Sequence, residues 1–142
     1  MKLYYSPGAC SLSPHIPLRE AGLAFDLVKT DLRSKQTEDG GDYRQINPKG
    51  YVPALALDDG QVLTEGPVIV QYIADRVPER KLAPPNGSME RLRLQEWLNF
   101  ITSEIHKSFS PLFNPQASED WQAGARALLE RRIDYVAQAL EG

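Results

Sequence analysis

The segment LYYSPGACSLSPH, residues 3–15, decides the fold, because it joins an apolar strand to a helix through a proline–glycine loop. Its thiol, Cys10, is the one cysteine among the 142 residues. Ser11 suits the N-cap of a helix that ends near Gly22. A helix N-terminus offers unpaired N–H groups and a partial positive charge, which favour a thiolate. The position indicates either a reactive thiol or a small buried apolar residue.

Composition narrows the class of protein. Hydrophobic residues make up 42% of the chain and the net charge is -3, as expected of a globular protein with a core and without a nucleic-acid or membrane-surface partner. There is no apolar run long enough for a membrane span and no visible secretory signal, so we expect a cytoplasmic protein. One cysteine allows neither an internal disulfide nor a Cys-rich zinc site, and we expect no metal.

The first half of the chain alternates strand and helix patterns. The hairpin signal Asp59-Gly60 separates two short strands, and residues 33–50 indicate a loop with a short irregular helix. The expected order is β-α-β-α-β-β-α, with strands at 2–5, 24–32, 52–57 and 61–64 and helices at 10–22 and 65–77. Pro84, Pro85 and Gly87 then mark a linker, after which two apolar stripes predict long helices.

Two further turns carry candidate binding groups. Pro53 opens a strand, and a cis bond before it would leave the Val52 main chain free to pair with an extended ligand. Glu65 and Gly66 lie where the last strand meets the next helix, so a backbone N–H there could bind a carboxylate and Glu65 an amine. The alternative for Glu65 is an acidic residue that merely stabilises its own helix.

Four motifs together give a resemblance to a known family. YYSPGACSLSPHI, NPKGYVPAL, LTEGPVIVQYIAD and EWLNFITSEIHKSFSPLF resemble the bacterial beta class of cytosolic glutathione S-transferases over the whole chain. The resemblance implies an α/β thioredoxin-like domain at 1–80, a linker at 81–87 and an all-α domain at 88–142. The all-α part resembles only the first two long helices of that domain, without its C-terminal part.

The resemblance also implies a function and a site. The activity is transfer of glutathione to small electrophiles, with peroxide or disulfide reduction as a further activity; glutathione is a co-substrate, no cofactor is needed, and the protein is a homodimer. Cys10 and His106 are the implied catalytic residues and Pro53 a structural one. The implied glutathione contacts are Cys10, Lys35, Val52, Glu65, Gly66, Asn99, Ser103, Glu104, Ile105 and His106, some of them supplied by a partner subunit.

Local patterns bear on parts of this assignment. Asn99, Ser103 and His106 are spaced by four and three, which puts them on one face of an α-helix. Position 66 is often Ser in related enzymes, and Gly66 offers only its N–H. His15 has no comparable support and indicates a surface histidine.

Other functions remain open at this stage. The alternatives are a non-catalytic glutathione-binding or protein-interaction module, an inactive fragment, and a monothiol redox carrier whose motif PGACS only loosely matches.

Overall fold

The computed structural model describes residues 1–141, which form two compact units, the first ending at Arg91 and the second beginning at Leu92. The division lies inside a helix, a few residues after the linker 81–87 in which the sequence placed the boundary.

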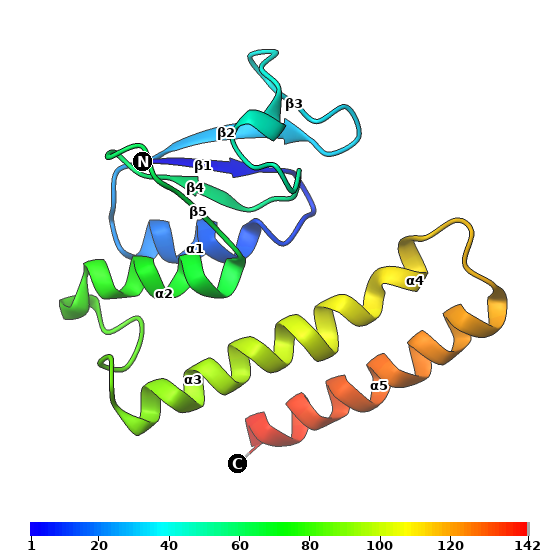
Figure 1. The fold of residues 1–142 in the computed structure, drawn as a ribbon. Helices are drawn as coiled ribbons and strands as arrows, with labels where there is room; N and C mark the ends of the chain where they lie inside the picture. The colour runs from blue at the N-terminus through cyan, green and yellow to red at the C-terminus, as the bar shows by residue number, and fades with distance from the viewer. Residues whose placement is uncertain (142) are drawn as a thin grey trace. The chain divides into compact units, whose positions relative to one another are not determined.

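The first unit is built on a five-stranded mixed sheet (Figure 1). Its strands are β1 (Lys2–Tyr5), β2 (Asp26–Asp31), β3 (Gln36–Thr37), β4 (Ala54–Ala56) and β5 (Val62–Thr64). The spatial order is β3-β2-β1-β4-β5, in which only the β1–β2 pair is parallel. The strand β3 was not expected from the sequence, because two residues are too few to show a pattern.

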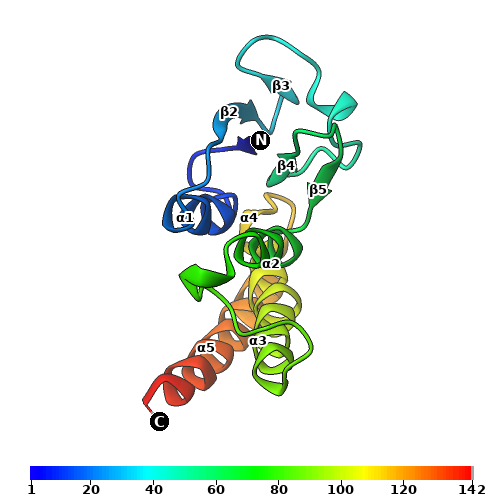
Figure 2. The same ribbon diagram turned by 90° about the vertical axis from the view of Figure 1, so that its left-hand side faces the viewer.

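Two helices cover one face of this sheet, α1 (Leu12–Glu20) and α2 (Gly66–Arg76). Figures 1 and 2 both show them side by side on the same side of the strands. Successive residues of a strand point to opposite faces, and Leu3 of β1, opposite Leu55 of β4, points towards the helices. The core between sheet and helices contains Leu3, Leu18, Ala21, Leu55, Ile69, Ile73 and Val77.

The other face of the sheet carries a smaller apolar cluster. Tyr4 and Ala54, which also oppose each other across β1 and β4, pack there with Val52 and Tyr43. Tyr43 belongs to the 3-10 turn η1 (Tyr43–Gln45), and its ring centroid lies 5.5 Å from that of Tyr4. The predicted order had its second helix within residues 33–50, and the structure has only this three-residue 3-10 turn there. The predicted order is otherwise confirmed, with a further 3-10 turn, η2 (Pro78–Arg80), after α2.

The second unit consists of helices. They are most of α3 (Met89–Phe100), the π-helical segment η3 (Ile101–His106), the 3-10 turn η4 (Lys107–Phe109), α4 (Ser110–Phe113) and α5 (Glu119–Glu141). The all-helical second half is therefore confirmed, although its first long helix is not a regular α-helix. Rings of Trp97, Phe100 and Tyr135 pack together where α3 meets α5. None of the helices in residues 1–141 has both the length and the apolar character needed to cross a membrane.

Candidate functional site

The loop that carries Cys10 is closed by a reciprocal pair of hydrogen bonds. The Ser6 amide donates to Ser11 Oγ at 3.2 Å, and Ser11 Oγ donates to the Ser6 carbonyl, also at 3.2 Å. Ser11 is buried and precedes α1 as its N-cap residue, as predicted, but its hydroxyl closes the loop instead of capping the helix. Cys10 is thereby held one residue before the cap.

The Cys10 thiol meets the backbone of Val52. Its Sγ donates to the Val52 carbonyl oxygen at 3.3 Å. The Val52–Pro53 peptide bond is cis, which confirms the expectation for this position. The registers that pair β4 with β1 and with β5 begin at Ala54, so Val52 lies outside the strand pairing, as predicted. The lone thiol and the unpaired backbone that precedes β4 are therefore parts of one site.

The expectation that this position favours a thiolate is wrong for the ligand-free protein. Partial burial raises the pKa of the Cys10 thiol above its usual range, and the negative charge of Glu65 raises it further. A hydrogen bond from the residue's own backbone acts in the opposite direction but is outweighed. Cys10 is therefore a protonated thiol at neutral pH, able to donate a hydrogen bond, and the influence of Glu65 shows that the carboxylate lies nearby.

Glu65 and Gly66 lie at the start of α2. Glu65 is its N-cap residue with φ 68° and ψ 115°, a conformation that is uncommon for a residue with a side chain. Its side chain makes no cap hydrogen bond, and the alternative of an acidic residue that stabilises its own helix through its charge is not tested by this geometry. The carboxylate instead accepts a hydrogen bond from Lys49 Nζ at 2.5 Å. A Cβ placed on Gly66 would meet no heavy atom within 4 Å, so no neighbouring group fills the space on that side of its Cα.

Lys35 lies near the same loop as Lys49. Its Nζ donates to the Gly50 carbonyl at 2.9 Å and lies 5.9 Å from the centre of the Tyr51 ring. Five of the expected residues, namely Cys10, Lys35, Val52, Glu65 and Gly66, thus belong to the first unit and lie at the loops between its strands and helices. Lys49, which contacts one of them directly, had not been singled out in the sequence.

The remaining expected residues belong to the second unit, at the end of α3 and in η3. Ser103, Glu104, Ile105 and His106 lie in the π-helical segment and Asn99 just before it. A π-helix has a wider turn than an α-helix, so the argument that put Asn99, Ser103 and His106 on one face by α-helical spacing does not hold.

Hydroxyl groups accompany this change of helix. Thr102 Oγ1, Ser103 Oγ and Ser108 Oγ each donate to the carbonyl four residues earlier, at 2.9, 3.0 and 2.7 Å. Such bonds compete with the backbone pattern and bend helices. This cluster of Ser and Thr residues is the signal by which the sequence could have indicated an irregular helix.

Glu104 has a partner within its own unit. Arg132 of α5 donates to Glu104 Oε2 at 2.5 Å, and its guanidinium lies 5.9 Å from the Phe100 ring centre. Both side chains are partly exposed. The pair joins η3 to α5 and fixes the segment that carries His106.

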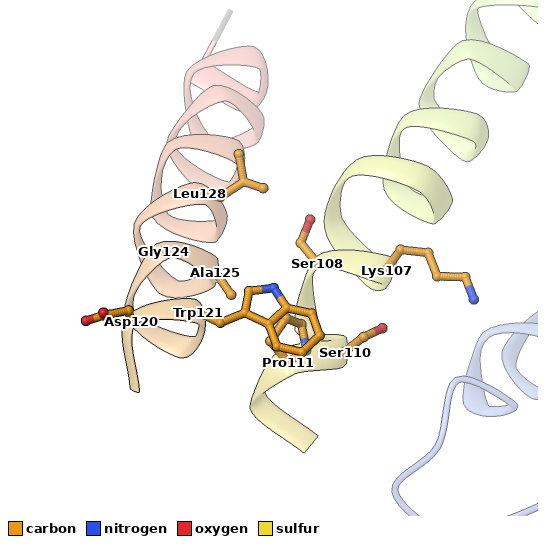
Figure 3. Close-up of a pocket in the computed structure, with 9 residues that line it drawn as sticks. All are labelled: Lys107, Ser108, Ser110, Pro111, Asp120, Trp121, Gly124, Ala125 and Leu128. Atoms are coloured by element: carbon orange, nitrogen blue, oxygen red, sulfur yellow. The ribbon is translucent and has the colours of Figure 1, made fainter. Parts of the chain in front are cut away.

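A separate pocket of about 480 Å³ lies within the second unit, between η4, α4 and α5. Figure 3 shows Trp121 and Leu128 on the side of α5 that faces Ser108 and Pro111, whereas Asp120 points away. Its lining residues are Lys107, Ser108, Ser110, Pro111, Asp120, Trp121, Gly124, Ala125 and Leu128. None of the residues predicted for the site lines it. In the part of the chain that the structure describes, no group of His, Cys, Asp and Glu side chains is arranged to hold a metal ion.

Comparisons with known proteins agree with the fold. The model of the glutathione S-transferase N-terminal domain matches residues 8–76. The chain is 54% identical to glutathione S-transferase GstA of Escherichia coli O157:H7 over 141 residues, which are 99% of this chain and 70% of that protein.

Solved structures are equally similar. The ternary complex of BphK, a bacterial GST, has a TM-score of 0.97 and 66% identity, over 99% of this chain and 70% of that one. A sphingomonad glutathione S-transferase complexed with glutathione has a TM-score of 0.97 and 49% identity, over 100% and 71% of the two chains. A bacterial beta class enzyme from Sphingomonas chungbukensis has a TM-score of 0.94 and 49% identity, over 99% and 70%.

A mixed sheet with two helices on one face, followed by a helical unit, is the thioredoxin-like and all-helical arrangement of glutathione-dependent transferases. The chain belongs to the glutathione S-transferase family and is similar to its bacterial beta class.

Proposed function

We propose that this protein joins the sulfur of glutathione to small electrophilic compounds. The observation that carries the proposal is the meeting of the Cys10 thiol, the Val52 carbonyl and the influence of Glu65 in one unit. These groups supply a contact for a sulfur, a contact for a peptide main chain and a negative charge for an amino group. A short thiol peptide with an amino group requires these three kinds of contact.

Each part of glutathione has a candidate partner in the first unit. The Val52 main chain pairs with the cysteinyl backbone, beside Pro53. Glu65 binds the amine of the γ-glutamyl group, and the Gly66 N–H, at the start of α2, binds its carboxylate. Lys35 approaches the glycine carboxylate once it leaves the Gly50 carbonyl.

The chemistry uses the glutathione thiol as the nucleophile. Its proton is lost, the thiolate attacks the electrophilic carbon, a carbon–sulfur bond forms, and the leaving group departs. Hydrogen-bond donors stabilise a thiolate and lower the pKa of the thiol. Because Cys10 is protonated at neutral pH, its S–H, which donates to the Val52 carbonyl in the ligand-free protein, can turn to donate to the glutathione sulfur instead. A mixed disulfide formed by attack of Cys10 on oxidised glutathione requires the Cys10 thiolate and is therefore favoured at alkaline pH.

The proposal extends to the second unit and to assembly. Asn99, Ser103, Glu104, Ile105 and His106 are further proposed contacts of glutathione, with His106 as a proposed catalytic residue. We propose a homodimer in which a partner subunit supplies part of these contacts, a cytoplasmic location, and no cofactor beyond the co-substrate glutathione.

The test is a conjugation assay with a chlorodinitrobenzene. Formation of the thioether and release of chloride are expected for the native protein with glutathione, and calorimetry should detect glutathione binding. Binding without conjugation would instead indicate a non-catalytic glutathione-binding module. Absence of both would refute the proposal. Static light scattering at several protein concentrations tests the dimer independently.

A further inference from the structure

Lys49 and Glu65 form an exposed ion pair at the start of α2. Lys49 Nζ lies 2.5 Å from Glu65 Oε1 and 3.1 Å from Thr64 Oγ1. The side chains are 50% and 59% exposed, so a dissolved ligand can reach both charges. Exposed ion pairs contribute little to stability, and this pair can therefore be rearranged at small cost.

The backbone of Lys49 is fixed by a buried asparagine. Asn47 Nδ2 donates to the Tyr51 carbonyl at 2.7 Å, and Asn47 Oδ1 accepts the Lys49 amide at 3.2 Å. The Gly50 amide donates to the Asn47 carbonyl at 2.8 Å, which closes the turn. Tyr43 Oη also donates to the Tyr51 carbonyl, at 2.8 Å. The turn is thus tied to the buried cluster under the sheet, and only the Lys49 side chain is left to move.

The ligand end that faces Glu65 in the proposed function carries two charges. The γ-glutamyl group of glutathione ends in an α-ammonium and an α-carboxylate on one carbon. Glu65 can bind only the ammonium. Gly66 has no side chain, so it offers the carboxylate no more than a backbone N–H. The cation that lies within reach of this point is Lys49 Nζ, already in contact with Glu65.

We propose that Lys49 and Glu65 act together as a subsite for this zwitterionic end, in which the Lys49 ammonium binds the α-carboxylate and the Glu65 carboxylate binds the α-ammonium. The inference rests on the proposed function. In the free protein the two side chains neutralise each other, and on binding each exchanges its partner for the opposite charge of the ligand. Lys49 is then a binding residue that selects a free α-amino acid.

Two analogues separate the two charges. In one, a glutaryl group replaces the γ-glutamyl group and the α-amine is missing. In the other, a γ-aminobutyryl group replaces it and the α-carboxylate is missing. Binding of glutathione and of both analogues is measured by calorimetry for the native protein, Lys49→Met, Lys49→Arg and Glu65→Gln. Lys29→Met, at an exposed lysine of β2, is the matched control.

We expect Lys49→Met to weaken binding of glutathione and of the glutaryl analogue by about tenfold, the lower range for hydrogen bonds to charged groups. Binding of the γ-aminobutyryl analogue should not change, because it has already lost the group that Lys49 binds. Glu65→Gln should show the reverse selectivity. Lys49→Arg should keep the native pattern, and Lys29→Met should match the native protein with all three ligands.

Three results would overturn the inference while native glutathione binding persists. Lys49→Met could bind like the native protein. It could lose affinity equally for the γ-aminobutyryl analogue, which would mean that Lys49 only orients Glu65. It could also bind that analogue more tightly, which would mean that Lys49 competes with the ligand. If the native protein itself binds no glutathione, the proposed function fails first, and the inference fails with it.

Discussion

The ion pair between the buried Arg91 and the half-exposed Asp75 gives the sharpest stability prediction. Arg91 Nη1 and Nη2 donate to the two Asp75 carboxylate oxygens, each at 2.8 Å. Arg91 also donates to Gln71 Oε1 at 3.2 Å and to the Pro84 carbonyl at 3.0 Å. The Arg91 side chain is 3% exposed, whereas that of Asp75 is 45% exposed. This arrangement fixes the linker and the first turn of α3 to α2.

Because Arg91 is more deeply buried than Asp75, removing Asp75 should lower the free energy of unfolding more than removing Arg91. Asp75→Ala leaves the Arg91 charge buried with only two neutral acceptors. Removing one partner of a fully buried pair costs about 3–5 kcal/mol, and the partial exposure of Asp75 reduces this to about 2–3 kcal/mol. Arg91→Met leaves Asp75 able to regain water and fills the space with an apolar side chain, so we expect a loss of about 1 kcal/mol.

The assay is urea denaturation followed by circular dichroism, with hydrogen exchange of peptides from α2 and the start of α3 to locate the effect. Glu96→Ala is the matched control, because Glu96 pairs with Arg93 where both side chains are well exposed, and no change is expected. The reasoning is refuted if Arg91→Met destabilises the protein more than Asp75→Ala, or if Asp75→Ala behaves like the control.

The remaining predictions concern the site and its neighbours. Alkylation of Cys10 by iodoacetamide, followed by mass spectrometry, should have its pH midpoint above that of an unstructured cysteine peptide, because burial raises the pKa of the thiol. Glu65→Gln should lower that midpoint, since the negative charge of Glu65 also raises the pKa of Cys10. A midpoint that does not change in Glu65→Gln would contradict the influence of Glu65 on the thiol. Burial raises the pKa of Tyr43 to about 12 from 10.0. As the pH rises from 10.0 to about 12, the Tyr43 hydroxyl loses its proton in the unfolded state before it does so in the folded state. The free energy of unfolding should therefore fall over this pH range, and it should fall less in Tyr43→Phe. Glu65→Ala should weaken glutathione binding by about ten- to hundredfold in calorimetry, and equal binding by Glu65→Ala and the exposed-residue control Glu20→Ala would remove Glu65 from the site.

The sequence predicted those parts of the fold that repeat or that turn sharply. The short apolar run around Leu3, the Asp59-Gly60 hairpin and the apolar spacing in α2 are local patterns, and each corresponds to an element of the structure. The expectation of a cis bond before Pro53 began with a proline at the start of a strand, and the family resemblance then supported it. The π-helical segment was missed because spacing arguments assume α-helical geometry and do not weigh hydroxyl groups that bond to the preceding turn.

The electrostatics of the site could not be read from sequence for a different reason. Position at a helix start predicts a lowered pKa for Cys10, but the result depends on the balance between that effect, burial and the charge on Glu65, which lies far away in the chain. Arg91 and Lys49 look like ordinary surface cations in the sequence. Their partners lie 16 residues away in both cases, and only the folded chain brings them together.

The single thiol also decides how this protein recovers from oxidation. A sulfenic acid formed at Cys10 has no second cysteine among the 142 residues with which to condense. Its reduction must therefore use a thiol that arrives from solution, and the rate of repair rises with the concentration of that thiol. The exposed position of Cys10 allows such a thiol to reach the sulfur. Oxidation of this sulfur and its reduction thus both depend on reagents in the surroundings of the protein, and not on a second thiol within the 142 residues.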